Sequence, residues 1–360
     1  PDQSDILTYH KADVPEPSGP TMDLTATNIV IATGAKPRPL PGNPFAGALI
    51  DSTQALEVNE FPSSAVIIGA GAIALEFASM WNAAGSKVTL LIRKDRVLSA
   101  WDRRAGTTLT RELKRHGVNI ITRASVTHVD TGANLGATVH YTREGQDGEQ
   151  SVWGEIALVA IGRDPITDPA WGVTIDDHGH VATDAYGRTD KPGVWAVGDV
   201  TAGHALAHRA FEQGIVIAET IAGLNPKPVD EATVPQIVFS FPEAASVGLT
   251  VEQAQAREDL IEIKETNYPM LANARMLMSG TAGSLTIVSG CDAANPDTPR
   301  VLGVHMVSQM ASDIIAEAEQ LVGNHVPLAD AARLVHPHPT FSETLGEALL
   351  KADGRPLHTR

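Results

Sequence analysis

The chain has 360 residues, of which 43% are hydrophobic and 19% charged, as is typical of a folded protein with room for two or three domains. Its formal net charge of −16 argues against nucleic acid and anionic membranes as partners. The sequence shows neither an apolar run long enough to span a membrane nor a signal peptide, so we expect a cytoplasmic protein.

The first predicted element with a clear pattern is a buried strand at residues 28–32. Thr33 and Gly34 end it, and three prolines between residues 37 and 41 exclude a helix or a central strand beyond it. We therefore expect the chain to leave one domain here and to enter another.

Residues 65–93 predict a strand, a glycine turn, a helix and a second strand. Gly69 permits the tight turn, Gly71 lets a pyrophosphate approach the helix N-terminus, and Ala74 fills a position that needs a small side chain. The helix is expected to bury one apolar face, formed by Ile73, Phe77, Met80, Trp81 and Ala84. This context favours a dinucleotide site over a βαβ turn that uses glycine for geometry alone.

The end of the second strand bears on which nucleotide binds. Ile92 stands where an NAD site usually has an acidic residue for the ribose hydroxyls, and Arg93, Lys94 and Arg96 follow it. An acid would repel a 2′-phosphate, whereas guanidinium groups bind it with paired hydrogen bonds. The alternative is a basic turn that contacts only solvent. Because the acidic residue of an NAD site is also missing, we favour NADPH over NADH.

Further elements of this domain are a helix and four strands, predicted at 102–116, 118–121, 125–130, 137–143 and 152–161. A short strand at 194–200 then contains Gly198 and Asp199, and a helix follows at 205–223. Asp199 is well placed to hydrogen-bond a sugar or polyol hydroxyl, but it could equally terminate the strand or cap the helical region. Its local sequence leaves both readings open.

From about residue 234 strands and helices no longer alternate, which predicts a separate α+β domain. Its predicted strands lie at 236–240, 260–268, 284–289 and 301–307, and its helices at 251–257, 311–323 and 328–334. The single cysteine, Cys291, is expected in a polar loop and cannot form an internal disulfide, as suits the cytoplasm.

The last motif with chemical potential is V-H-P-H-P-T-F-S-E-T-L at 335–345. Pro339 keeps His338 extended, and Ser342 is placed to cap the following helix. Glu343 lies in the first turn, where a carboxylate that accepts a hydrogen bond from an imidazole would make it a better general base. A single histidine usually has no catalytic role, so this motif alone leaves the role of His338 open.

Together the motifs resemble those of the FAD-dependent pyridine nucleotide–disulfide oxidoreductase family. They form an ordered series over nearly the whole chain: A-T-G-A at 32–35, G-A-G-A-I-A-L-E at 69–76, A-I-G-R at 160–163, V-G-D at 197–199, A-L-A-H at 205–208 and H-P-H-P-T-F-S-E at 336–343. The C-terminal half is most similar to the dihydrolipoamide dehydrogenases of that family. The basic turn instead resembles the NADPH-binding turn of its glutathione reductases, except that Ser99 stands where a second arginine is expected.

The resemblance implies roles for individual residues. The FAD site would be lined by Thr33, Gly34, Asp199, Ala205, Leu206, Ala207 and His208, with Asp199 on the ribityl chain. Glu76 and Gly162 would line the nicotinamide site. His338 would be the acid/base of dithiol exchange, with Glu343 as its partner, and would act at the disulfide of the other subunit of a homodimer.

The implied fold is α/β, with Rossmann-like FAD- and NAD(P)-binding domains followed by an α+β dimerisation domain. Residues 1–50 would be the remnant of the FAD domain, 51–184 the NAD(P) domain, 185–232 the return to the FAD domain and 233–360 the dimerisation domain. Members of the family also begin with an FAD-binding βαβ unit and a redox-active cysteine pair. Neither is present here, so we expect a fragment that does not reduce disulfides by itself.

The implied function is electron transfer between NAD(P)H and a dithiol or disulfide through FAD, as in dihydrolipoamide dehydrogenases. One alternative is an NADPH-dependent reductase of glutathione- or mycothiol-type disulfides, or a mercuric reductase. Another, of a different class, is a nucleotide-binding paralogue without dithiol chemistry.

Overall fold

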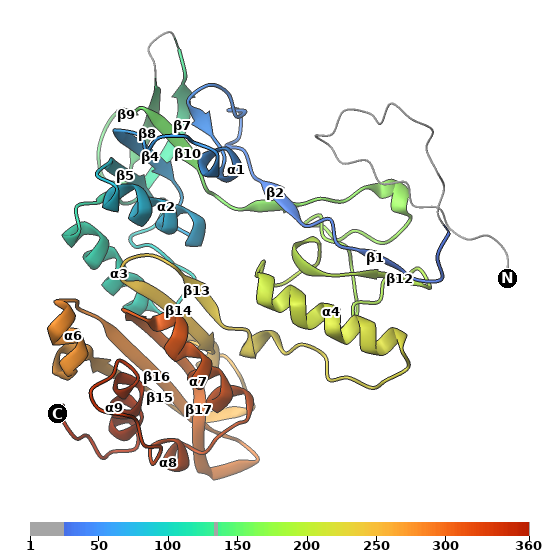
Figure 1. The fold of residues 1–360 in the computed structure, drawn as a ribbon, viewed down its shortest axis with the longest axis vertical. Coiled ribbons are helices and arrows are strands. Elements are labelled where there is room, and N and C mark those ends of the chain that lie inside the picture. The colour runs from blue at the N-terminus through green and yellow to red at the C-terminus, as the bar shows by residue number, and fades with distance from the viewer. Residues whose placement is uncertain (1–24, 133–135, 360) are drawn as a thin grey trace. The chain divides into compact units, whose positions relative to one another are not determined.

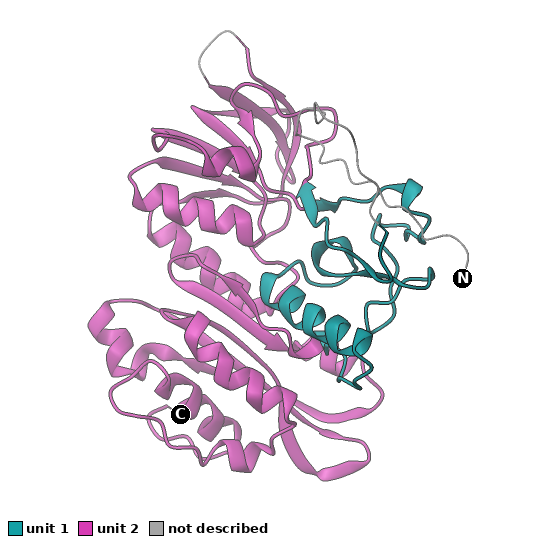
Figure 2. Cartoon of the chain, turned by 45° about the vertical axis from the view of Figure 1, so that its right-hand side comes forward, with its two compact units in different colours: residues 1–36, 163–231 teal, residues 37–162, 232–360 magenta. Residues whose placement is uncertain are grey.

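The computed structural model describes residues 25–132 and 136–359, whose helices and strands are labelled in Figure 1. The described residues form two compact units, one from 25–36 and 163–231 and the other from the described parts of 37–162 and 232–360 (Figure 2). The chain passes from one unit to the other at 36/37, 162/163 and 231/232. The domain boundaries at 50/51, 184/185 and 232/233 stay predictions. In the described residues no helix is long and apolar enough to cross a membrane.

In the first unit, strand β1 (Ile29–Ile31) pairs in parallel with β12 (Val194–Ala196). The predicted strand at 194–200 is shorter than expected, because Gly198–Val200 forms a 3-10 turn, η2. Helix α4 (Ala207–Ile221) follows. A second pair of short strands, β2 (Ala35–Pro37) and β11 (Arg163–Pro165), lies where the chain changes units.

The second unit contains a five-stranded parallel sheet, which the alternation of strands and helices predicts. Its strand order is β3 (Leu49–Ile50), β10 (Ile156–Val159), β4 (Ser64–Ile68), β5 (Lys87–Leu91) and β6 (Asn119–Ile121). The helices of this region are α1 (Ser52–Leu56), α2 (Ala72–Ala83) and α3 (Arg103–Arg115). An antiparallel three-stranded sheet is formed by β7 (Ala124–Asp130), β8 (Ala137–Arg143) and β9 (Gln150–Gly154).

Two predictions for this region need correction. Met80 and Ala84 were expected on the buried face of α2, but Met80 is 42% exposed and Ala84 is an exposed C-cap residue. The helix buries Ala74, Leu75 and Ala78 beside Phe77 and Trp81 instead. Small residues occupy the buried face of α2 because the helix packs closely against the sheet. The predicted strand at 152–161 is two strands, β9 and β10, which belong to different sheets. The chain turns between them at Glu155, whose carboxylate accepts a hydrogen bond from the Ser63 amide at 2.7 Å.

The C-terminal part of the second unit is an antiparallel sheet with helices, as predicted. The strand order is β13 (Gln236–Val238), β14 (Glu243–Gly248), β17 (Asn295–Ser308), β16 (Ser284–Asp292) and β15 (Leu260–Pro269). The helices are α5 (Val251–Gln255), α6 (Ala274–Ser279), α7 (Ala311–Gly323), α8 (Leu328–Ala331) and α9 (Glu343–Ala352). Strand β14 and helix α6 were not predicted.

Both faces of this sheet pack against other elements. Successive side chains of β16 point to opposite faces of the sheet, so alternate residues contact different elements. Leu285 and Ile287 join the apolar core shared with α7, α8 and α9 (Figure 1). Ser284 and Thr286 alternate with them and point to α3, where Ser284 donates a hydrogen bond to Thr108 at 3.1 Å. Cys291 lies in the same strand and is fully buried, so the prediction that it occupies a polar loop is wrong.

Candidate functional site

The glycine turn between β4 and α2 has the geometry of a phosphate cradle. Gly69 has a φ of +144°, and a Cβ there would lie 2.1 Å from the carbonyl oxygen of Ala160 and 3.3 Å from the Cβ of Ala74. Only glycine fits this position, and only a small residue fits at Ala74. Gly71 is the N-cap residue of α2, and a Cβ there would meet no atom within 4 Å. The helix N-terminus is therefore open to an approaching anion.

A cavity of about 580 Å³ lies at this turn, within the size range of nucleotide and cofactor pockets. Gly69, Ala70, Arg93, Lys94 and Ser99 line it. The lining contains arginine and lysine but no aspartate or glutamate among the described residues. Positive charge beside a glycine turn is what the phosphates of a dinucleotide require.

Not every residue predicted for the nucleotide lines this cavity. The side chain of Arg96 is only 16% exposed, and its guanidinium donates hydrogen bonds to the Ser99 carbonyl at 3.1 Å and to Asp95 at 3.3 Å. The carboxylate of Glu76 accepts a hydrogen bond from the Phe239 amide at 3.0 Å; burial raises its pKa, and that bond lowers it in part. Gly162 has a φ of +129°, and its carbonyl accepts a bond from the Arg38 amide at 3.1 Å. The places of Glu76 and Gly162 at a nicotinamide stay predictions.

In the first unit two of the residues predicted for the flavin, Thr33 and Asp199, follow the strands of the β1–β12 pair. Because the two strands are parallel, Thr33 and Asp199 both follow carboxyl ends, where ligands bind in open α/β sheets. Thr33 donates a hydrogen bond to the Ile166 carbonyl at 2.6 Å. Asp199 is half-buried, and within the described part of the chain its carboxylate has no hydrogen-bond partner. It is therefore an acceptor available to a ligand.

The start of α4 holds the remaining predicted flavin residues, Ala205, Leu206, Ala207 and His208. Leu206 is the N-cap residue and offers no side-chain bond to the helix, and His208 is exposed. The side chain of Gln213 on α4 accepts a hydrogen bond from the Gly198 amide at 3.0 Å, which fixes η2 against this helix. The turn that carries Asp199 is thus held in place by its neighbour.

The predicted pair of an imidazole and a carboxylate is present before α9. His338 Nδ1 lies 2.8 Å from Glu343 Oε1, and Glu343 Oε2 accepts a hydrogen bond from the Thr340 amide at 2.8 Å. Burial would raise the pKa of Glu343, but the Thr340 amide and His338 together lower it below its ordinary value. The His338 side chain is 74% exposed, so its second nitrogen is open to a substrate.

One detail of this segment differs from the prediction. Ser342 is the N-cap residue of α9, but its side chain makes no cap bond and lies 2.8 Å from the Thr340 hydroxyl. Glu343 takes over the bond to the backbone by reaching back to Thr340. The carboxylate is therefore fixed by the chain and by the imidazole at once.

The sequence analysis missed the partners that hold this segment. His336 is 9% exposed and lies 3.0 Å from the Glu317 carboxylate on α7, an interaction that raises the pKa of His336 against the effect of its burial. A Cβ on Gly346 would come within 2.4 Å of the His336 ring, so a glycine in α9 makes room for it. Asn273 donates a hydrogen bond to the Thr340 carbonyl at 3.0 Å. No spacing in the sequence indicates these contacts, because Glu317 and Asn273 are distant in the chain from the residues that they hold.

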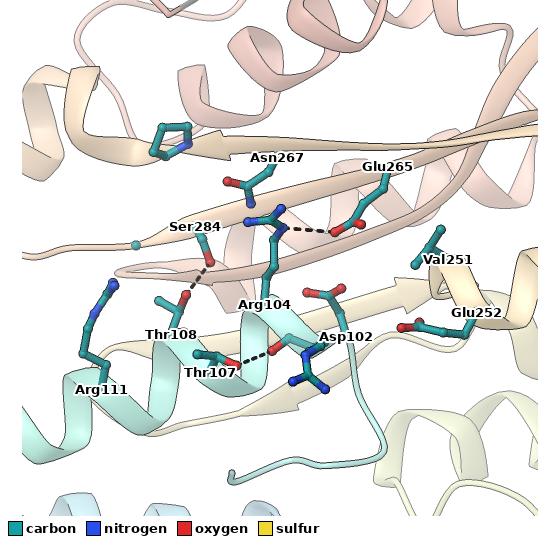
Figure 3. A pocket seen from close by; sticks show the side chains of 13 residues that line it. Asp102, Arg104, Thr107, Thr108, Arg111, Val251, Glu252, Glu265, Asn267 and Ser284 are labelled. Atoms are coloured by element: carbon teal, nitrogen blue, oxygen red, sulfur yellow. Dashed lines mark hydrogen bonds and ion pairs between the residues drawn. The ribbon is translucent and has the colours of Figure 1, made fainter. Parts of the chain in front are cut away.

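A second cavity, of about 490 Å³, lies between α3 and the β15–β16 edge (Figure 3). Arg103, Arg104 and Arg111 line it, but so do three acidic residues, and Arg104 lies 3.1 Å from Glu265. It shares no lining residue with the glycine-turn cavity. None of the residues predicted for cofactor or catalysis belongs to it.

Comparison with known proteins agrees with this geometry. Residues 3–214 match the family described as "Pyridine nucleotide-disulphide oxidoreductase", and residues 234–349 match its dimerisation domain. The chain belongs to the pyridine nucleotide–disulphide oxidoreductase family. The family resemblance and the α/β fold predicted from the sequence are thereby confirmed.

Members of the family with curated names include dihydrolipoyl dehydrogenases of Cupriavidus necator, 38% identical, and of Bacillus subtilis, 36% identical. Each match covers 93% of this chain and 70% of the relative. Among solved structures, LpdA from Mycobacterium tuberculosis superposes with a TM-score of 0.82 at 27% identity, over 93% of this chain and 72% of that one. The flavoprotein disulfide reductase RclA from Escherichia coli has a TM-score of 0.80 at 26% identity, over 91% and 74%.

The family uses FAD and NAD(P), and the residues present fit both groups. For the dinucleotide, the open space at Gly71 and the cationic cavity beside it provide room and charge. For the flavin, the available carboxylate of Asp199 and the turn at Thr33 lie at one strand edge.

Proposed function

We propose that this chain is part of a flavoprotein oxidoreductase of the dihydrolipoamide dehydrogenase type, which transfers electrons between NAD(P)H and a dithiol or disulfide substrate. The observation that carries the proposal is the His338–Glu343 pair, with its 2.8 Å contact and exposed ring. The names of the two dihydrolipoyl dehydrogenase relatives support it.

The proposed chemistry of His338 follows from its hydrogen bond. A carboxylate only accepts, so Nδ1 carries the proton that it donates to Glu343, and Nε2 of the neutral ring is left as the base. Nε2 then takes a proton from a substrate thiol and later returns it. Because the thiolate is the nucleophile in thiol–disulfide exchange, the rate depends on this proton transfer. Glu343 stabilises the imidazolium that forms.

We assign the cofactor contacts to the residues located above. Gly69, Gly71 and Ala74 would receive the pyrophosphate of NAD(P)H, with Glu76 and Gly162 nearer the nicotinamide. The flavin would be held by Thr33, Gly34, Asp199 and the four residues from Ala205 to His208. Bound FAD would supply two-electron exchange between the nicotinamide and the dithiol, while the protein orients and polarises the reacting groups.

Within this proposal NADPH is the preferred dinucleotide. Arg93 and Lys94 line the cavity at the glycine turn, and Arg93 is the residue we expect on a 2′-phosphate. Arg96 was part of the same prediction, but its bonds to Ser99 and Asp95 direct it elsewhere, so we assign it to holding the turn.

The proposed working unit is a homodimer, in which His338 acts at the redox disulfide of the other subunit. The match to a dimerisation domain supports this, as do large apolar side chains exposed near the His338 segment. These are Leu271, Leu277, Met278, Leu334 and Val335. Covering such a patch by a second copy would remove it from water.

The similarity to RclA, which is named a flavoprotein disulfide reductase, supports a second candidate function. This function is the reduction of a low-molecular-weight disulfide or of Hg(II) by NADPH. Steady-state assays of the full-length gene product, loaded with FAD, would separate the candidates. We expect turnover with lipoamide and less with glutathione disulfide or Hg(II). No turnover with lipoamide would refute the dihydrolipoamide assignment, and no turnover with any of the three would favour a nucleotide-binding paralogue without dithiol chemistry.

A further inference from the structure

Two histidines face each other across the β7–β8 hairpin, apart from every residue assigned above. His128 on β7 pairs with His140 on β8, and their rings stack with centroids 4.1 Å apart and an interplanar angle of 8°. The two rings point the same way, because one carboxylate approaches the Nε2 atom of both and another approaches the Nδ1 atom of both.

The carboxylate on the Nε2 side belongs to Asp130, two residues after His128 and so on the same face of the strand. Its Oδ2 atom lies 3.1 Å from His140 Nε2 and 3.9 Å from His128 Nε2. Three ligand atoms, two nitrogens and one oxygen, thus converge from two neighbouring strands. Among the described residues no lysine or arginine neutralises Asp130.

We propose that His128, His140 and Asp130 bind a divalent transition-metal ion of the Zn²⁺ type. Ligand bonds of about 2.0–2.2 Å in tetrahedral geometry place neighbouring donor atoms about 3.3 Å apart. The separation of 3.1 Å is close to this value, and that of 3.9 Å shortens on binding. Two imidazoles with one carboxylate suit Zn²⁺, Ni²⁺ or Cu²⁺ better than Mg²⁺ or Ca²⁺, which prefer oxygen. Water completes the coordination.

On the Nδ1 side a second carboxylate faces both rings, at distances longer than a hydrogen bond. Glu149 Oε1 lies 3.8 Å from His128 Nδ1, and its Oε2 lies 3.7 Å from His140 Nδ1. The Thr127 hydroxyl donates to Glu149 at 2.7 Å and holds it in place. A carboxylate at the second nitrogen of a metal-bound histidine fixes the tautomer and makes the ring a stronger ligand.

Binding requires a small rearrangement that the surface permits. Parallel rings do not aim both nitrogen lone pairs at one point, so each ring turns about its Cβ–Cγ bond until the two converge. His128 and His140 are 46% and 22% exposed, which leaves room for this turn. Asp130 and Glu149 bring negative charge to the site, which a divalent ion offsets. The ion would link β7 to β8 and stabilise this sheet.

The test is zinc titration of the whole chain after removal of metal with a chelator, followed by calorimetry and thermal unfolding. We expect saturable binding of one Zn²⁺ per chain and a rise in Tm on adding zinc. His140→Ala and Asp130→Asn should abolish both, and Glu149→Gln should weaken binding by about 10–100-fold. His178→Ala, which removes an exposed histidine elsewhere, is the matched control and should bind as the parent chain does.

Circular dichroism of each variant without metal checks that the sheet is intact. Asp130→Asn and Glu149→Gln keep side-chain shape, so they remain informative if a histidine variant unfolds. Failure of the parent chain to bind zinc, or binding that survives Asp130→Asn and His140→Ala together, would overturn the proposal. The site shares no residue with the proposed redox chemistry, so neither result depends on it.

Discussion

The carboxylate of Glu343 joins two groups, since one oxygen lies 2.8 Å from His338 Nδ1 and the other accepts the Thr340 amide at 2.8 Å. An imidazole that is 74% exposed is thereby held in one orientation by a carboxylate that the backbone fixes. The same helix supplies the carboxylate of a second pair, Glu347 with His358, also at 2.8 Å. The two pairs have similar local geometry, but only His338 is proposed to act on a substrate thiol.

That second pair provides a control for the role of Glu343. In Glu343→Gln the amide can still accept from Thr340, but its NH₂ group then faces Nδ1 and favours the wrong tautomer of His338. We expect dithiol turnover of the full-length gene product to fall by about 10²-fold or more. Glu347→Gln should leave turnover near that of the parent enzyme. Equal losses in the two variants would show that Glu343 acts only through stability.

The two glycines of the cradle should respond differently to alanine. Gly69→Ala places a Cβ 2.1 Å from the Ala160 oxygen at a φ of +144°, so we expect a loss of about 3 kcal/mol or more in the free energy of unfolding. Gly71→Ala meets no protein atom, and we expect it to cost about 1 kcal/mol or less while NAD(P)H binding weakens about tenfold or more. Urea unfolding and nucleotide titration measure the two effects. Unchanged NAD(P)H affinity in Gly71→Ala would contradict the proposed position of the pyrophosphate.

The basic turn makes a prediction about cofactor preference. Arg93→Ala should remove roughly 1–3 kcal/mol of the preference for NADPH over NADH, as expected for a charge-assisted hydrogen bond. Arg96→Ala should change the preference less, because its guanidinium is bound to Ser99 and Asp95. Dissociation constants of both nucleotides for the parent and the two variants decide the matter. Equal affinities for NADPH and NADH in the parent chain would refute the assignment.

The partly buried pair of His336 and Glu317 should make stability depend on pH. The pKa of His336 is raised in the folded state, chiefly by its hydrogen bond to Glu317. The stabilisation from this pair is therefore complete below about 6.5, the pKa of His336 in the unfolded chain. It is lost as the pH rises through the pKa of His336 in the folded chain. Glu317→Gln should lower the free energy of unfolding by about 1 kcal/mol at pH 5.5, allowing for the partial exposure of Glu317, and by less at pH 9. A larger loss of stability at pH 9 than at pH 5.5 would contradict this direction of the pH dependence.

Local patterns in the sequence predicted much of this molecule. The βαβ unit with its glycine turn and helix α7 at 311–323 follow from periodicity and composition within short windows. The His338–Glu343 contact was also predictable, because five residues and a proline bring the two groups together. The α/β fold and the family follow from the order of such motifs.

Features set by distant residues could not be predicted in this way. Cys291 is buried because β16 lies inside a sheet, although its neighbours in sequence are polar. Glu317 meets His336 through the packing of α7, and no spacing indicates that contact. The pairing of His128 with His140 depends on a register shift between Val126 and His128, which the hydrophobic pattern does not reveal. Arg96 and Arg93 looked alike in sequence, and only the fold of the turn separates them.

The central claim is that His338 moves the proton of the thiol and takes no part in the exchange between nicotinamide and flavin. Stopped-flow measurement of both half-reactions in the FAD-loaded full-length gene product, with and without His338→Gln, tests it most directly. We predict that flavin reduction by NAD(P)H is nearly unchanged while the dithiol half-reaction slows by about 10²–10⁴-fold. A His338→Gln enzyme whose dithiol half-reaction proceeds at the parent rate would contradict the claim.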